Sequence, residues 1–412
     1  MKLGLENMRT VLSALGNPHD KYKKVQVAGT NGKGSVCAFL NSICLRAGIK
    51  TGLYTSPHLV SITERIRIDG VDIAEDEFAR LATRVRDAAE ELLSAGQLEY
   101  RPTFFEQVTA IALLGFAEAR IDLAILETGL GGRLDATTAA EAEIVAITQI
   151  AFDHQEYLGD TIEKIAAEKA AVIRPGTKAV LAHQTKPVER VLIGRCREVG
   201  VEPVWAPEAI SVAADVGWLA PQFRTSRYTY SGFDLIEMPG RHQVPNAAVA
   251  IALAEILQDD GFDISVDDIR YGLETASHPG RLECIGRFLL DGAHNAAGAR
   301  ALREYLDEFV TRPITIIFGA MKGKDVAGIT DILFQKADSI ILAQPNNSRA
   351  MNVELLAEFV PETFNKNKVH LVPNVSEALE KARSLAQENE VILVTGSLYL
   401  VGEIRKILTT HG

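Results

Sequence analysis

The chain has 412 residues, of which 47% are hydrophobic and 24% are charged. These proportions are typical of a globular protein of about two to three domains, and they exclude a collagen-like chain, a low-complexity disordered chain and a small disulfide-stapled domain. The net charge of −11, from 43 basic and 54 acidic residues, argues against non-specific binding to nucleic acid, because that binding depends on Lys and Arg at the phosphates.

The spacing of the cysteines and the length of the apolar runs indicate in which compartment the protein works. The four cysteines, Cys37, Cys44, Cys196 and Cys284, contain no CxxC pair, which favours free thiols over a zinc or redox site. No apolar run reaches the roughly 18 residues of a membrane helix, and the first ten residues lack the apolar core of a signal peptide. We therefore expect a cytoplasmic protein whose partners are small molecules rather than nucleic acids or membranes.

Apolar strand-like runs alternate with helical patterns over the first part of the chain. The runs are short and continuous, as in strands buried on both faces of a parallel sheet, and they span 24–28, 122–127 and 144–148. Helical patterns are expected at about 35–47, 75–95, 104–120, 160–173, 244–258 and 265–275. The alternation predicts an α/β architecture.

The pattern changes near residue 204 and restarts near residue 280. Between 204 and 237, aromatic residues stand among Thr, Ser and Gly, which predicts a small antiparallel sheet whose aromatic side chains pack rather than bind a ligand. Turn residues at 276–281 then precede a second α/β alternation. Its predicted strands are 287–290, 314–318, 339–343, 369–372 and 391–394, and its predicted helices include 297–308 and 326–335.

A glycine-rich loop stands between the first strand and the first long helix. Its candidate phosphate-binding residues are Gly29, Thr30, Asn31, Gly32, Lys33, Gly34 and Ser35. Glycines let backbone N–H groups converge on a phosphate, the helix N-terminus adds its dipole, and the lysine adds a charge. The usual GxxxxGK[ST] spacing is not matched, since Gly34 separates Lys33 from Ser35. The alternative is a glycine-rich turn with a solvated lysine, but the strand–loop–helix context favours a nucleotide-binding loop.

This loop resembles that of the Mur ligase superfamily and, more specifically, that of the folylpolyglutamate synthase/dihydrofolate synthase family. The resemblance continues in order along nearly the whole chain. Its further motifs are Ser56-Pro57-His58-Leu59, Glu64-Arg65-Ile66, Thr103-Phe104-Phe105-Glu106, Glu127 to Thr137, Asp153-His154, Glu168-Lys169-Ala170, Pro245-Asn246-Ala247, Pro279-Gly280-Arg281, Asp291 to Asn295 and Thr395-Gly396-Ser397.

The resemblance implies a Mur-ligase-like α/β fold with an N-terminal P-loop ATPase domain, 1–278, built on a parallel sheet. A smaller Rossmann-like α/β domain, 279–412, would follow. The implied activity is an ATP-dependent amide ligase that adds L-glutamate through an acyl phosphate. Its implied acceptor is a folate, and the sequence leaves open whether dihydropteroate is a second acceptor. The implied cofactors are ATP and one or two Mg²⁺ ions, with a monovalent cation allowed, and we expect a monomer.

The resemblance also implies roles for individual residues. Ser56, Glu127 and His154 would bind the metal, and Glu127 suits this role because it ends a buried strand. Lys33, Lys169, His154, Arg281 and His294 would be catalytic, with Lys169 carbamylated by carbon dioxide. Further ATP contacts would come from Asn246, Arg281, Asp291 and Ser397. The acceptor would be held by Thr103, Phe104, Phe105, Glu106, Leu134, Asp135 and Ala136, although Phe104 and Phe105 also suit a helix-start core position.

Two other function classes remain open from the sequence. A phosphate-loop ATPase or kinase would transfer phosphate without forming an amide, and a folate-binding protein could retain the fold without catalysis. Lys33, Glu127, His154 and Lys169 argue against the second, because the charged residues of the site are retained. Glutamate-dependent release of ADP separates the ligase from the ATPase.

Overall fold

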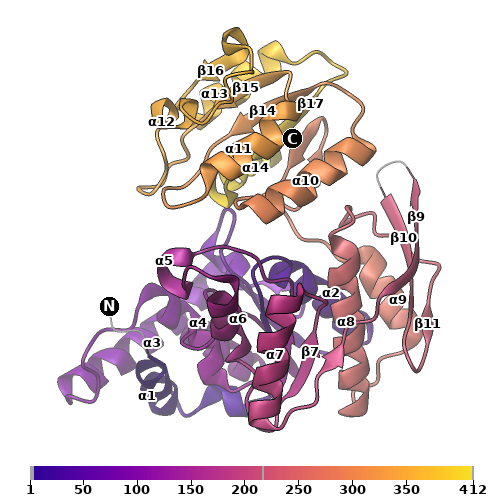
Figure 1. Ribbon diagram of the computed structural model, residues 1–412. Helices are drawn as coiled ribbons and strands as arrows, with labels where there is room; N and C mark the ends of the chain where they lie inside the picture. The colour runs from indigo at the N-terminus through magenta and orange to yellow at the C-terminus, as the bar shows by residue number, and fades with distance from the viewer. Residues whose placement is uncertain (1–3, 216–217, 411–412) are drawn as a thin grey trace.

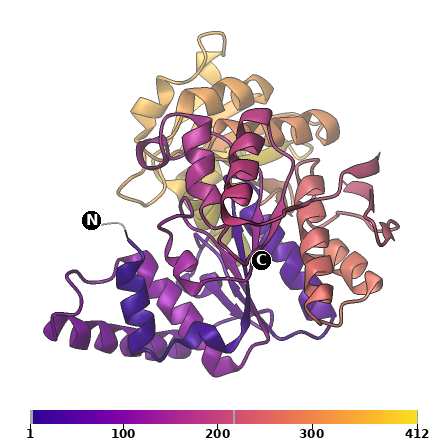
Figure 2. The same ribbon diagram turned by 60° about the horizontal axis from the view of Figure 1, so that its bottom comes forward.

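The computed structural model describes residues 4–215 and 218–410, which form two α/β parts around separate sheets (Figure 1, and in a turned view Figure 2). The larger part holds an eight-stranded sheet and a small three-stranded sheet, and the second part holds a six-stranded sheet. We propose a domain boundary between residues 278 and 279, in the turn between the last helix of the first part and the first strand of the second.

The eight-stranded sheet has the order β4-β3-β2-β5-β1-β6-β7-β8, in which β3 and β4 form an antiparallel extension and the other strands are parallel. Its strands are β1 (Lys23–Ala28), β2 (Thr51–Tyr54), β3 (Ile66–Ile68), β4 (Val71–Asp72), β5 (Leu123–Glu127), β6 (Ile144–Ile147), β7 (Lys178–Leu181) and β8 (Val204–Trp205). The chain continues from β1 to strands on both sides of it, so the carboxyl end of β1 is a switch point where α/β proteins bind ligands.

Helices cover both faces of this sheet. On one face Val25 and Val27 pack against the helices α2 (Lys33–Arg46), α8 (Gln243–Asp259) and α9 (Val266–Thr275). The opposite face is covered by α1 (Glu6–Ala14), α3 (Glu75–Ser94), α4 (Phe104–Ala119), α6 (Ile162–Ala170) and α7 (Lys186–Val199). The short helix α5 (Gln155–Leu158) lies beneath the second part in Figure 1.

The predicted antiparallel excursion is confirmed as a three-stranded sheet. Its strands are β9 (Ala209–Asp215), β10 (Trp218–Arg224) and β11 (Thr229–Tyr230), while residues 216 and 217 lie outside the described part of the chain. Phe223, Tyr230 and Phe233 are buried in the same apolar cluster as α8. The aromatic residues named here therefore pack in the core, as predicted.

The six-stranded sheet has the order β12-β13-β17-β14-β15-β16, parallel except for β12. Its strands are β12 (Glu283–Ile285), β13 (Phe288–Leu290), β14 (Ile314–Phe318), β15 (Ser339–Leu342), β16 (Val369–Leu371) and β17 (Val391–Thr395). One face packs on α10 (Ala296–Phe309), α11 (Val326–Leu333) and α12 (Val353–Ala357), and the other on α13 (Val375–Leu385) and α14 (Leu398–Thr410).

The structure confirms the predicted α/β class and adds elements that the sequence pattern did not reveal. Every predicted strand and helix has a counterpart whose ends differ by a few residues. The strands β2, β3, β4, β7 and β12 were not predicted. The prediction of an antiparallel sheet from residue 204 was wrong for β8, which pairs in parallel with β7 at the edge of the larger sheet. In the described part of the chain, each helix is too short or too polar to span a lipid bilayer.

Candidate active site

The phosphate loop leaves β1 at the carboxyl edge of the larger sheet and enters α2. Gly29 and Gly32 have positive φ angles of 147° and 88°, and side chains there would collide with the side chains of Thr148 and Asn246. Lys33 is the first residue of α2, and its Nζ donates to the carbonyl oxygen of Thr30 at 3.1 Å. The N-terminus of α2, the glycine backbone and the lysine thus lie together in one loop. This combination suits a phosphate, because backbone N–H groups, the helix dipole and a positive charge can all act on it.

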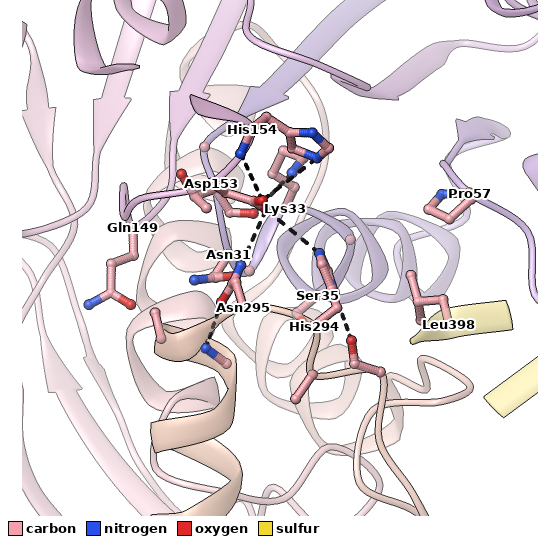
Figure 3. A pocket seen from close by; sticks show the side chains of 18 of the residues that line it. Asn31, Lys33, Ser35, Pro57, Gln149, Asp153, His154, His294, Asn295 and Leu398 are labelled. Atoms are coloured by element: carbon pink, nitrogen blue, oxygen red, sulfur yellow. Dashed lines mark hydrogen bonds and ion pairs between the residues drawn. The ribbon is translucent and has the colours of Figure 1, made fainter. Parts of the chain in front are cut away.

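The loop forms one wall of a cavity of about 600 Å³ between the two parts (Figure 3). The cavity lies at the carboxyl ends of both sheets, which face one another across it. The residues predicted to bind ATP or metal or to act in catalysis all line it, namely Gly29 to Ser35, Ser56, Glu127, His154, Lys169, Asn246, Arg281, Asp291, His294 and Ser397. The structure therefore gathers into one cavity residues that are up to several hundred positions apart.

Glu127 supplies a buried carboxylate to this cavity from the end of β5. Its side chain is 6% exposed, and its Oε2 accepts a hydrogen bond from the backbone N–H of Ser56 at 3.0 Å. Burial raises the pKa of Glu127, and the charge of Lys33 opposes the rise. The cations whose charges act on this carboxylate are Lys33, Arg281 and Arg65.

These residues fit a magnesium ion that is shared with a nucleotide. The described residues contain no group of three His, Cys, Asp or Glu side chains that could hold an ion alone. Mg²⁺ is commonly bound by one or two carboxylates together with waters and substrate phosphates, and it would balance the buried charge of Glu127. The Ser56 hydroxyl and Glu127 are the neighbouring oxygen donors, whereas His154 lies beside Lys324, with 3.3 Å between Nε2 and Nζ.

We expect Glu127→Gln to weaken Mn²⁺ binding in the presence of an ATP analogue by at least about 10-fold, because the variant loses the charged donor. The amide oxygen can still accept from Ser56, and the buried charge is gone, so the melting temperature should match or exceed that of the wild type. Electron paramagnetic resonance of Mn²⁺ and calorimetric melting measure the two quantities. Unchanged Mn²⁺ affinity in the folded variant would contradict the metal role.

Asp153 joins the two parts at the cavity wall. Its carboxylate pairs with Lys324 at 2.6 Å, lies 3.7 Å from His294 and accepts from Asn295 Nδ2 at 3.3 Å (Figure 3). Asn295 Nδ2 also lies 3.1 Å from Asn31 Oδ1 in the phosphate loop. Burial alone would raise the pKa of Asp153, but Lys324 and His294 hold it below its ordinary value. The carboxylate therefore stays charged and holds the second part against the first.

We expect reversal of one charge in this pair to separate the two parts. Asp153→Lys leaves like charges facing each other in a mostly buried site, at a cost on the order of 3 kcal/mol, and should enlarge the radius of gyration in small-angle scattering. The double variant Asp153→Lys, Lys324→Asp should recover the compact form. As a control, the same reversal of the exposed pair Asp160 and Lys164 should change nothing. A compact Asp153→Lys variant would show that the pair does not hold the parts together.

Arg281 and Asp291 face the cavity from the second part. Asp291 is buried, and its oxygens accept from the backbone N–H groups of Leu282 at 3.0 Å and Ala293 at 2.9 Å. Burial raises its pKa, while the charge of Arg281 opposes this. The carboxylate thus fixes the segment that carries Arg281 and leaves the guanidinium available to an anion in the cavity.

Lys169 lies beneath the phosphate loop, on α6. It is 5% exposed, and its Nζ donates to the carbonyl oxygen of Gly29 at 2.7 Å. Burial, helped by the positive charge of Lys33, lowers the pKa of Lys169 to about 7. A lysine with this environment is a neutral amine in a substantial fraction of molecules at physiological pH, which makes it nucleophilic.

Comparison with known proteins agrees with this geometry. The model of the Mur ligase middle domain matches residues 27–254, and the model of the dihydrofolate synthetase C-terminal domain matches residues 282–408. The dihydrofolate synthase/folylpolyglutamate synthase of Bacillus subtilis is 35% identical over 99% of this chain and 95% of its own length. The chain belongs to the folylpolyglutamate synthase/dihydrofolate synthase family. The predicted family and its Mur-ligase-like fold are thereby confirmed.

Two solved structures of the family have the same fold over almost the whole chain. Folylpolyglutamate synthase of Mycobacterium tuberculosis, complexed with ADP and AMPPCP, gives a TM-score of 0.93 at 31% identity, covering 98% of this chain and 95% of that one. A bifunctional folylpolyglutamate synthase/dihydrofolate synthase with Mn, AMPPNP and L-glutamate bound gives a TM-score of 0.85 at 31% identity, covering 99% and 95%.

The family's predicted acceptor-binding residues lie apart from this cavity wall. Among the described lining residues, none belongs to Thr103 to Glu106 or to Leu134 to Ala136. Glu106 and Thr103 form a capping box at the start of α4, and Asp135 accepts from the backbone N–H groups of Gly129 and Leu130. These contacts shape the loops around the cavity, and the acceptor role of the two segments stays a prediction.

Two residues that line the cavity were not singled out from the sequence. Asp153 was noted only as the neighbour of His154, and Lys324 was not noted. Both follow parallel strands at their carboxyl ends, Asp153 after β6 and Lys324 after β14. That position is the signal that would have identified them.

Proposed function

We propose that this protein is an ATP-dependent ligase that joins L-glutamate to a folate through an acyl phosphate. The observation that carries the proposal is the single cavity in which the phosphate loop and Glu127 face Arg281 and His294 of the second part. The relatives solved with ATP analogues, manganese and L-glutamate support ATP, a divalent cation and glutamate as its ligands.

The first step is attack of the acceptor carboxylate on the γ-phosphorus of ATP, which releases ADP and leaves an acyl phosphate. The phosphate loop and Lys33 hold the phosphates, and Arg281 offsets negative charge from the opposite wall. A divalent ion held by Glu127 and Ser56 would supply further charge neutralisation. Phosphorylation is required because a free carboxylate has no adequate leaving group.

In the second step the amino group of glutamate attacks the acyl carbon, and phosphate leaves from the tetrahedral intermediate. The attacking amine must be neutral and must lose a proton as the amide forms. His294 lies at the cavity wall, where burial and the charge of Lys324 lower its pKa to about 4. It is therefore a neutral imidazole at pH 7, which adds no positive charge to repel the cationic form of the glutamate amine. Closure of the cavity by the two parts excludes water, which would otherwise hydrolyse the acyl phosphate.

The decisive assay measures ADP release with ATP and Mg²⁺, with and without glutamate, and with dihydropteroate or a reduced folate in separate arms. A ligase sustains ADP release over many turnovers only when both acceptor and glutamate are present, because without glutamate it stops at one acyl phosphate per active site. Mass spectrometry of the complete reaction then finds an acceptor heavier by one glutamate. An ADP release rate that is the same with and without glutamate would favour the ATPase alternative. Binding of folate without ADP release in any arm would favour a non-catalytic folate-binding protein.

A further inference from the structure

The loop that follows β2 carries Ser56 at one end and Leu59 at the other. Leu59 belongs to the first part, yet its side chain packs against the apolar cluster beneath α13 and α14 of the second part. A Cβ on Gly280 would lie 3.1 Å from Leu59 Cδ1 and 3.2 Å from Val401 Cγ1, so the leucine also touches the connection between the parts. Leu59 is thus a half-buried residue of the first part that packs against the core of the second part.

Gly402 permits this insertion. It lies inside α14, and a Cβ there would collide with the carbonyl oxygen of Leu59 and lie 2.8 Å from the carbonyl carbon. These are backbone atoms, so they cannot rotate away as a side chain can. Glycine weakens the interior of a helix relative to alanine, so its presence here is explained by the close approach.

The loop itself is held too firmly to absorb a displacement of Leu59. The Glu64 carboxylate accepts from the backbone N–H groups of Leu59 at 2.8 Å, Val60 at 3.0 Å and Ser61 at 2.8 Å. At the other end, the backbone N–H of Ser56 donates to the carboxylate that ends β5. A shift of Leu59 is therefore passed on to Ser56.

The partners of Leu59 in the second part also lead directly into the cavity. Gly280 precedes Arg281, and α14 begins immediately after Ser397. In Figure 3, Pro57 of the loop and Leu398 of α14 lie on the same side of the cavity. One contact therefore connects the loop that carries Ser56 with both second-part segments that line the site.

We propose that Leu59 and Gly402 are positioning residues of the ligase reaction. Their contact seats α14 on the first part so that Arg281 and Ser397 face Ser56 and Glu127 at the correct separation. The inference rests on the proposed function for its kinetic consequence. Its structural consequence, the seating of the two parts, stands independently of the reaction catalysed.

The test compares Gly402→Ala with Gly194→Ala, each in the full chain. Gly194 lies inside α7, where an added Cβ meets nothing within 4 Å, so this control changes helix propensity alone. Gly402→Ala should lose affinity for a fluorescent ATP analogue by no more than a few-fold, because the phosphate loop keeps its contacts while only Arg281 and Ser397 are displaced. Its kcat should fall on the order of 10²-fold, as expected for a misplacement of about 1 Å, and its radius of gyration should increase. Gly194→Ala should match the wild type in all three measurements.

A second variant pair keeps the test decisive if Gly402→Ala folds poorly. Leu59→Ala adds no clash, and it should lower kcat while retaining nucleotide affinity, whereas Leu59→Met should restore both kcat and compactness. The inference is overturned if Gly402→Ala has the kcat and the radius of gyration of the wild type. If Gly402→Ala is unfolded, the same result in Leu59→Ala overturns it. If the wild type itself releases no ADP with glutamate, the proposed function fails, and the scattering comparison still decides whether this contact seats the two parts.

Discussion

Replacement of Lys33 by alanine is expected to lower ATP-dependent turnover by at least about 10³-fold while the fold is retained. The lysine is the cation of the phosphate loop, and loss of a preorganised charge beside a transferring phosphoryl group removes stabilisation of the transition state. Its recorded side-chain hydrogen bond is to the carbonyl oxygen of Thr30 in the same loop, so little packing is lost. Turnover and a circular dichroism melt of the same preparation measure both expectations.

Lys50 provides a matched control for this variant. Its Nζ also donates to a backbone carbonyl oxygen, that of Ala119 at 2.6 Å, but it is not among the residues that line the cavity. Lys50→Ala should therefore keep wild-type turnover. Near-normal turnover in a folded Lys33→Ala variant would contradict the assignment of the phosphate loop. An equal loss of turnover in Lys50→Ala would show that the effect comes from general destabilisation.

The fold could be predicted where burial leaves a continuous apolar run in the sequence. The strands β1, β5, β14 and β17 are central in their sheets, and their side chains are almost entirely buried. Such strands consist of consecutive apolar residues that a local reading can find. The capping box at Thr103 and Glu106 similarly marks where α4 begins.

The strands that were missed are defined by their neighbours rather than by their own sequence. The strand β2 is only four residues long and contains Gly52, where an added Cβ would meet the ring of Phe116. Glycine disfavours a strand locally, and the reason for it here is a helix that packs closely over the sheet. Such a tertiary requirement has no local signature.

The residues of the site likewise fall into those that could be predicted from the sequence and those that could not. Lys33 could be predicted because it follows a recognisable strand, and Glu127 because it ends one, and the cavity includes both. The pairing of Asp153 with Lys324 could not, because the two residues lie on different sheets and nothing in either segment specifies the other. The burial of Lys169, which its proposed chemistry requires, was inferred from small apolar neighbours and is confirmed.

Loss of turnover in Lys169→Ala, partly restored by acetate, is the second large effect that we expect. The neutral amine would attack carbon dioxide and lose a proton, which leaves a carbamate in place of the cation. Acetate supplies a carboxylate to the space that the shortened side chain leaves. Lys164→Ala, on the exposed face of the same helix, should keep full activity. A nuclear magnetic resonance signal from ¹³C-bicarbonate that is lost in Lys169→Ala would identify the carbamate directly.

The direction of the pH dependence follows from the lowered pKa of about 7. Below that pH, Lys169 is protonated and cannot react, so activation by bicarbonate should be present at pH 8 and lost at pH 6. The modification is refuted if bicarbonate does not change the turnover of the wild-type enzyme between pH 6 and pH 8 and no carbamate signal is found.

Replacement of Lys169 by methionine should raise the free energy of unfolding while it abolishes activity. Between pH 7 and about 10.4 the unfolded chain binds a proton at this lysine that the native protein releases, so native stability rises with pH across that window. The free-energy penalty of burying this lysine is fully present below pH 7, where it amounts to about 5 kcal/mol. Lys169→Met removes the penalty and should unfold at higher denaturant concentration than the bicarbonate-free wild type at pH 6, yet it should be inactive. A variant that is more stable and inactive would show that the buried lysine is retained for the reaction, because its burial opposes folding.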